Sequence, residues 1–155
     1  MSPRLRDELK QGKPFGSAEQ QAHLSIERTA AVLGHALAEA MKPYGITPTQ
    51  YNVLRILRGA GESGLCRHEV RDRLVAQVPD VTRLLDRLEQ SGLIRRERND
   101  KDRRLVATRI TERGLELLRT MDQPVMEEHR RQLGHMTEEQ LTTLAELLAV
   151  ARRAG

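Results

Sequence analysis

The stretch from Pro79 to Thr111, PDVTRLLDRLEQSGLIRRERNDKDRRLVATRIT, decides the fold of this chain. Its first half places apolar residues at spacings of three and four, which predicts an amphipathic helix that ends near Gly92. These residues are Val81, Leu84, Leu85 and Leu88. Residues 93–94 then begin a strand, and residues 105–110 alternate as a second strand. Residues 99–102 have the composition of a turn, so the sequence predicts a helix followed by a two-stranded hairpin.

Working outward, capping boxes predict three further helix starts, at residues 17–20, 47–50 and 137–140. Apolar periodicity extends these starts to helices over about 18–41, 48–58 and 138–151. A short helix is expected over about 67–75. Thr111 should cap another helix, in which Pro124 must produce a kink or a break. The terminal helices carry apolar stripes and have no sheet to cover, so a second copy of the chain is their simplest partner.

The composition favours packed helices, because the chain has only three aromatic residues, Phe15, Tyr44 and Tyr51, and no Trp. The net charge of +4 is concentrated in one segment. Residues 67–109 hold 12 Lys/Arg and 8 Asp/Glu, and the rest of the chain holds 14 of each. A concentrated basic face is typical of proteins that bind a polyanion, although a chance asymmetry of a solvated surface explains the charge equally well.

Several classes of protein are disfavoured. A single cysteine, Cys66, excludes an intrachain disulfide framework and a Cys-rich zinc site. No apolar run approaches the roughly 20 residues that span a bilayer, and the N-terminus lacks the apolar core of a signal peptide. We therefore expect a cytoplasmic protein. The sequence shows no nucleophile–base motif, phosphate loop or metal triad, so we expect no enzyme activity and no cofactor.

The layout resembles the MarR (multiple-antibiotic-resistance regulator) family of winged helix–turn–helix transcription factors, over roughly residues 18 to 153. The motifs that carry the resemblance are residues 80–89, 92–96, 102–104 and 110–111. The resemblance implies a mainly α fold with a small β-hairpin wing, in a single MarR-type domain over residues 1–155. Dimerisation helices would cover 17–42 and 112–153, and the winged-helix DNA-binding lobe would cover 47–111.

Physical reasoning assigns roles on the helix of residues 79–91. A recognition helix reads base edges with its N-terminal residues, so Thr82 and Arg83 are the candidate base contacts. Arg87 lies one turn further on and suits a phosphate. A salt bridge from Arg83 to Asp80 or Asp86 is the alternative. Val78-Pro79 stands where the family usually has a small hydroxyl cap, so we expect a helix start near Pro79 without a side-chain cap.

In the hairpin, the resemblance implies that Arg104 enters the minor groove and is positioned by Asp102. Arg103 is the alternative occupant, because the strand register is not readable from the sequence. A guanidinium suits a narrow minor groove. Arg96 and Arg98, together with Arg95, are candidate phosphate contacts, although strand alternation turns some of them away.

Other residues carry weaker hypotheses. Cys66 lies near a helix start beside Arg67, where thiols can be reactive, but its simpler interpretation is a small residue that begins the helix. His129 and His135 with two neighbouring glutamates form the nearest approach to a metal cluster, and we expect no metal there. The family usually places effectors in a crevice near its dimerisation helices, and by analogy Tyr44, Tyr51 and Arg55 would line it. Ordinary packing is the simpler interpretation of each of these residues, so we assign no effector-binding residue.

We therefore expect a dimeric, sequence-specific DNA-binding regulator, a repressor released by a small-molecule effector, which binds a pseudo-palindromic operator. Two alternatives stay open. A winged helix can serve as a protein–protein interaction module without sequence-specific DNA binding. The chain could also be the dimerisation fragment of an enzyme, although we expect the 155 residues to be a whole protein.

Overall fold

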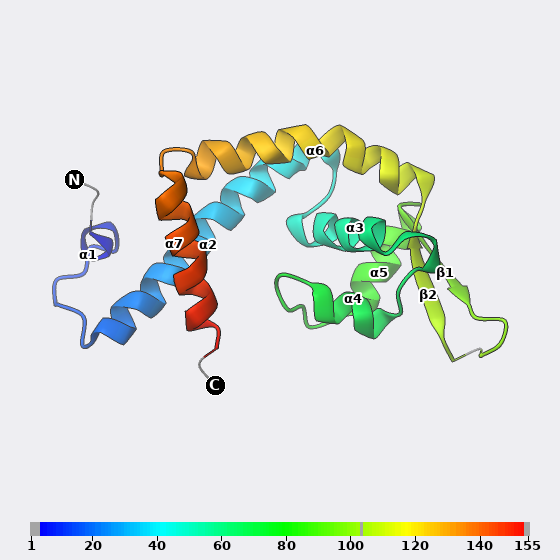
Figure 1. Cartoon of the computed structure of the whole chain (residues 1–155), viewed down its shortest axis with the longest axis horizontal. Coiled ribbons are helices and arrows are strands. Elements are labelled where there is room, and N and C mark those ends of the chain that lie inside the picture. The colour runs from blue at the N-terminus through cyan, green and yellow to red at the C-terminus, as the bar shows by residue number, and fades with distance from the viewer. Residues whose placement is uncertain (1–3, 103, 154–155) are drawn as a thin grey trace. The chain divides into compact units, whose positions relative to one another are not determined.

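The computed structural model describes residues 4–102 and 104–153. The chain forms two compact units, one up to Glu39 and the other from Ala40 onward. The first unit holds α1 (Leu5–Glu8) and most of α2 (Ala18–Met41). The second holds η1 (Lys42–Tyr44), α3 (Pro48–Ala60), η2 (Gly61–Ser63), α4 (Arg67–Arg73), α5 (Val81–Gln90), β1 (Ile94–Arg98), β2 (Val106–Ile110), α6 (Glu112–Leu133) and α7 (Glu138–Ala151). Figure 1 labels the α-helices and the two strands, and their order is the mainly α fold with a hairpin that the sequence predicts.

The core of the second unit is aliphatic and lies between α3, α5, β1 and α6. Its fully buried side chains include Leu54, Leu57, Leu85, Leu88, Ile94, Leu118 and Met121. The predicted stripe of α5 is largely confirmed, since Val81, Leu85 and Leu88 are buried and Leu84 is half-buried. A bidentate ion pair also joins α3 to α6, because Arg58 donates to both carboxylate oxygens of Asp122 over 2.8 and 3.2 Å.

The start of α5 differs from the sequence expectation. The helix begins at Val81, and Asp80 is its N-cap. The Asp80 carboxylate accepts the backbone N–H of Arg83 over 2.9 Å. The expectation of a helix from Pro79 without a side-chain cap was therefore wrong, because the aspartate immediately after the proline satisfies the free amide.

The end of α5 is as predicted. Gly92 has a φ of +74°, in the left-handed region that glycine adopts without a Cβ clash. Its N–H donates to the Glu89 carbonyl, and the N–H of Leu93 donates to the Leu88 carbonyl. This paired pattern ends the helix and directs the chain into β1.

The two strands form an antiparallel hairpin whose register assigns each side chain to a face. Arg95 lies opposite Arg109, Arg96 opposite Thr108, and Arg98 opposite Val106. The strands are shorter than predicted, because Leu93 and Leu105 lie outside them. Leu65 bridges to Thr108 and adds one more antiparallel pair at the edge of the hairpin.

α6 continues as one helix through Pro124. Of the two predicted outcomes, a kink or a break, the break does not occur. Figure 1 shows the helix as a single bowed rod. Its start is fixed as predicted, since the Thr111 hydroxyl accepts the Gly114 N–H and donates to the Gly92 carbonyl over 2.6 Å. Thr111 therefore connects the end of α5 with the start of α6.

The apolar stripes of α2 and α7 are not buried within the chain. α7 begins with its predicted capping box, but none of its residues is buried. The apolar periodicity of residues 138–151 predicts that Leu141, Leu144, Ala145 and Leu148 are buried. In the single chain this prediction is wrong, since Leu141 and Leu148 are only half-buried and Leu144 is 36% exposed. On α2, Met41 is the only described residue that is buried. In the described residues, no helix is both long and apolar enough to span a membrane.

Candidate nucleic-acid interface

The first turns of α5 present the residues that the sequence assigns to base and phosphate contacts. Thr82, Arg83 and Arg87 are all exposed. In the described part of the chain, the guanidinium groups of Arg83 and Arg87 have no ion-pair partner. Asp80, one alternative partner of Arg83, instead accepts its backbone N–H. The two side chains are therefore available for a ligand outside the chain.

Arg67 is a residue of this surface that the sequence analysis missed. It begins α4, and its Nη1 donates to the Thr82 hydroxyl over 2.9 Å. The two residues are 15 positions apart, so a local pattern does not reveal their contact. Both line a cavity of about 400 Å³, to which Arg104 of the wing, Arg96 and Thr108 also contribute.

Arg96 joins the hairpin to α5. Its guanidinium donates to the Glu89 carboxylate over 2.8 Å and to the Asp86 carboxylate over 2.5 Å. Glu89 also accepts the backbone N–H of Arg96. The hydrogen bonds that Arg96 donates lower the pKa of Glu89, and the carboxylates of Glu89 and Asp86 that accept them raise the pKa of Arg96. Arg96 as a phosphate contact stays a prediction, and the structure gives it a second role in fixing the hairpin to α5.

The tip of the wing is organised by Asn99 and Asp102. The Asn99 amide oxygen accepts the backbone N–H groups of Lys101 and Asp102 over 2.8 and 3.4 Å. The Asp102 carboxylate accepts the backbone N–H of Arg104 over 3.0 Å. Asp102 thus holds the main chain of Arg104, while the side chain of Arg104 is exposed. Arg103, the alternative minor-groove residue, lies outside the described residues.

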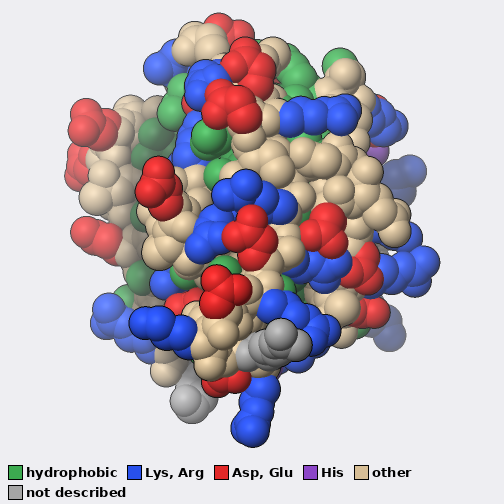
Figure 2. Space-filling view, turned by 90° about the vertical axis from the view of Figure 1, so that its right-hand side faces the viewer, with side chains coloured by type: hydrophobic (Ala, Val, Ile, Leu, Met, Phe, Trp, Pro, Cys, Tyr) green, Lys and Arg blue, Asp and Glu red, His purple; other side chains and the backbone are tan. Residues whose placement is uncertain are grey.

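On one face of the hairpin, a single carboxylate pairs with two arginines. Arg95 and Arg109 lie opposite one another, and Glu97 pairs with both, at 3.4 and 2.5 Å. Arg109 also donates to the Glu62 carbonyl. Arg98 is exposed and has no ion pair in the described ranges. Figure 2 shows the face on the hairpin side, where Lys and Arg side chains alternate with Asp and Glu side chains.

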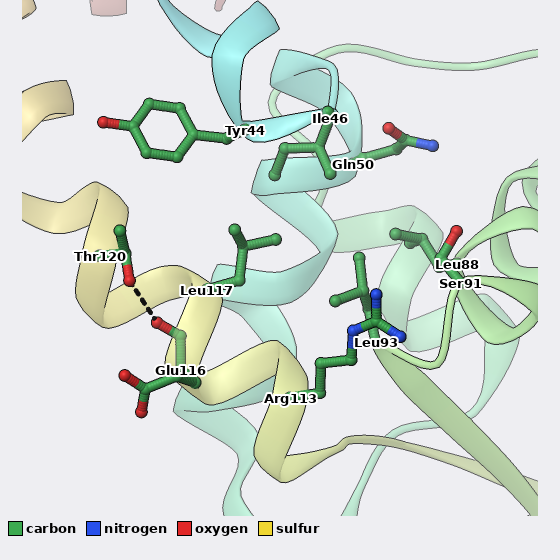
Figure 3. A pocket seen from close by; sticks show the side chains of 11 residues that line it. Tyr44, Ile46, Gln50, Leu88, Ser91, Leu93, Arg113, Glu116, Leu117 and Thr120 are labelled. Atoms are coloured by element: carbon green, nitrogen blue, oxygen red, sulfur yellow. Dashed lines mark hydrogen bonds between the residues drawn. The ribbon is translucent and has the colours of Figure 1, made fainter.

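A second cavity, of about 530 Å³, lies between the α3 and α6 segments of the second unit. Figure 3 shows Ile46 and Leu117 facing this space, with Arg113 reaching from α6 toward Leu93. Tyr44 lines this cavity, and its part in an effector crevice stays a prediction. Tyr51 is buried beneath Arg55, whose guanidinium lies 6.0 Å from the ring centroid, and neither is among the lining residues of this cavity.

Cys66 and Glu128, which belong to the weaker hypotheses, make hydrogen bonds within the chain. The N–H of Cys66 donates to the Glu69 carboxylate over 2.8 Å at the start of α4, and the thiol is half-buried. Glu128 accepts from Arg131 and Gln132 rather than joining the histidines. In the described residues, no group of three or more His, Cys, Asp or Glu side chains could hold a metal ion.

Comparisons with known proteins agree with this geometry. The model of the MarR family matches residues 44–105. The HTH-type transcriptional repressor MdtR of Bacillus subtilis is 31% identical over 135 residues, which cover 85% of this chain and 84% of MdtR. A MarR transcription factor from Planctomyces limnophilus is 36% identical with a TM-score of 0.68, over 88% of this chain and 99% of that chain. A mutant MarR from E. coli, solved in complex with operator DNA, is 25% identical with a TM-score of 0.80, over 90% and 99% of the two chains.

The helices α3, α4 and α5 followed by the β1–β2 hairpin define a winged helix–turn–helix protein. Because MdtR is 31% identical over most of both chains, and the MarR family model matches residues 44–105, the chain belongs to the MarR family of transcriptional regulators.

Proposed function

We propose that this protein is a homodimeric transcriptional repressor that binds a pseudo-palindromic DNA operator and is released by a small-molecule effector. The observation that carries the proposal is the exposed start of α5, where Thr82, Arg83 and Arg87 have no acidic partner in the described residues. Recognition helices read base edges in the major groove with these first turns. Such a protein would act in the cytoplasm, where it can reach DNA, and no catalytic step is assigned to it.

The proposed roles follow from position and exposure. Thr82 and Arg83 would contact base edges, and a bidentate contact from Arg83 to guanine would discriminate by about 1–3 kcal/mol. Arg87 and Arg98 would contact phosphates, which position the protein without reading sequence. Arg104, with its main chain held by Asp102, would enter the minor groove, with Arg103 as the alternative.

The dimer is supported by the exposed apolar residues of α7, including Leu147 and Val150, each 62% exposed. A second copy of the chain would cover them, as the two-fold symmetry of a palindromic operator requires. The half-sites of the operator should then lie about one helical turn, roughly 10 bp, apart.

The effector site is proposed at the cavity of about 530 Å³ between α3 and α6. Its volume lies in the range of small-molecule pockets. Arg113 lines it and has no ion pair in the described residues, so the cavity suits a small ligand with an acidic or phenolic group. Leu88 of α5, Leu93 just before β1, and Arg113 and Leu117 of α6 share this lining, so a ligand here would contact residues on both sides of the link that Thr111 makes between α5 and α6.

The test is fluorescence anisotropy on DNA from the promoter region of the protein's own gene, titrated with salt and competitor DNA. We expect tight binding that resists competitor and weakens steeply with salt. Arg83→Ala and Arg104→Ala should each remove the specific component. Arg130→Ala is the matched control, because Arg130 is an exposed arginine of α6 far along the chain from the hairpin.

Weak binding that is equal on all DNA, and unchanged in Arg83→Ala and Arg104→Ala, would overturn the proposal and favour the interaction module. Loss of affinity in Arg130→Ala as large as in Arg83→Ala would show that net charge, rather than the α5 surface, determines binding.

A further inference from the structure

The hydrogen bond between Arg67 and Thr82 joins the first turn of α4 to the first turn of α5. The Arg67 Nη1 donates to the Thr82 Oγ1 over 2.9 Å, and both residues are exposed. Both line the cavity of about 400 Å³ beside the wing, and its described lining residues include no carboxylate. The guanidinium of Arg67 is therefore directed to the hydroxyl of Thr82 rather than to an acidic side chain.

The bond determines which hydrogen-bonding group Thr82 presents outward. A hydroxyl has one donor and two acceptor positions, whereas a guanidinium only donates. Arg67 occupies an acceptor position, and its positive charge turns the O–H of Thr82 away from the guanidinium. The hydroxyl therefore offers its hydrogen to a group outside the pair.

The helix itself does not take up this hydrogen. In a helix interior, a threonine hydroxyl can donate to the carbonyl three or four residues back. Thr82 is the second residue of α5, so the residue four positions back is Val78, which precedes the helix. In the described part of the chain, the Thr82 hydroxyl has no acceptor.

We propose that Arg67 is a positioning residue that makes Thr82 a hydrogen-bond donor to acceptor groups of bases in the major groove. The inference rests on the proposed function, since it assumes that α5 enters that groove. Guanine O6 and N7 and thymine O4 are acceptors, whereas the N4 amino group of cytosine is a donor. Adenine N7 is an acceptor as well, so Thr82 selects guanine, adenine or thymine at its base position and rejects cytosine.

The experiment measures base preference with the full-length protein on its operator, obtained by selection from random DNA. Each operator position is replaced by the other three bases, and binding is measured by anisotropy. Thr82→Val should lower affinity roughly 3- to 10-fold and remove the preference at one base position in each half-site. Thr82→Ser, which keeps the hydroxyl, should retain that preference.

Arg67→Gln should weaken the preference at the same base position, and the double variant with Thr82→Val should show that the two losses are not additive. Arg71→Gln is the matched control, since Arg71 is an exposed arginine on the same helix, 3.6 Å from Asp72. It should lower affinity on all sequences alike, without a change in base preference.

The proposal is overturned if Arg67→Gln behaves as Arg71→Gln does, with uniform loss and unchanged preference, or if Arg67 and Thr82 act additively. This failure is distinguishable from failure of the proposed function. If the proposed function fails, the wild type shows no sequence preference at all. If only the role of Arg67 fails, the wild type and Arg83→Ala still differ. Thermal unfolding of each variant confirms that it is folded.

Discussion

At the scale of single residues, the arginines of the segment 67–109 divide into two groups that the sequence does not distinguish. Arg96 holds the hairpin to α5 through carboxylates, and Arg109 holds it to η2 through the Glu62 carbonyl. By contrast, Arg83, Arg87, Arg98 and Arg104 are exposed. Charge pattern alone identified the basic segment. It could not separate the groups, because the partners of Arg96 lie seven and ten positions away on another element.

The pH dependence of stability tests whether Glu89, the partner of Arg96, holds the hairpin in place. Arg96 lowers the pKa of Glu89 in the folded protein. The pair therefore stabilises the folded protein at pH values above the ordinary glutamate pKa of about 4.5, and this stabilisation is lost as the pH falls through the lowered pKa of Glu89 in the folded protein. Glu89→Gln should therefore unfold at a lower temperature than wild type at pH 7, and the difference should shrink below about pH 4.5.

Thermal denaturation followed by circular dichroism between pH 3 and 7 measures this difference. Asp100→Asn is the control, because Asp100 is an exposed carboxylate of the wing turn with no hydrogen bond in the described residues. If the unfolding temperatures of wild type and Glu89→Gln differed by the same amount at every pH, the ion pair between Glu89 and Arg96 would not account for the difference.

At the scale of elements, the sequence predicted where most helices begin, because capping residues act within one turn. Thr47, Thr111 and Thr137 all cap as expected. Ser17 accepts the N–H of Gln20, but the Gln20 side chain accepts from Gly16 rather than Ser17. The start of α5 was misplaced because the aspartate cap follows a proline that is itself compatible with a first turn.

Gly114, in the first turn of α6, packs where no side chain fits. A Cβ at this position would lie 2.4 Å from the Leu93 carbonyl oxygen and 2.6 Å from Ile110 Cγ1. Gly114→Ala should therefore destabilise the protein by about 1–3 kcal/mol, because the start of α6 and the hairpin must move apart.

The matched control is Gly59→Ala on α3, where a Cβ would meet nothing within 4 Å. It should stabilise by about 0.5–1 kcal/mol, since alanine loses less backbone entropy in a helix. Urea denaturation of both variants measures the difference, and equal stability of the two would show that the contact of α6 with the hairpin is not tight.

At the scale of the whole molecule, the sequence predicted a partner from uncovered apolar stripes, and the exposed side chains of α7 agree with that expectation. Burial in the assembled protein could not be predicted from one chain, because the residues that would cover α7 come from outside it. The domain boundaries at 47–111 and the site residues likewise stay predictions until binding is measured.

Leu147→Glu tests the partner surface. A charge placed at a buried position of an interface is unfavourable, so the variant should dissociate at least tenfold more readily than wild type and lose affinity for the operator. Analytical ultracentrifugation measures the dissociation constant. Thr142→Glu, on the opposite side of α7, should remain associated, and a dimeric Leu147→Glu would exclude α7 from the interface.

The unbroken path of α6 through Pro124 has a mechanical consequence. Its 22 residues, at 1.5 Å each, make a rod roughly 33 Å long. Because Thr111 fastens one end of this rod to α5, a tilt of about 5° at the other end displaces the hairpin end by roughly 3 Å. One base-pair step of DNA is about 3.4 Å. A small angular change at the far end of α6 would therefore move α5, the proposed recognition helix, by nearly one base-pair step.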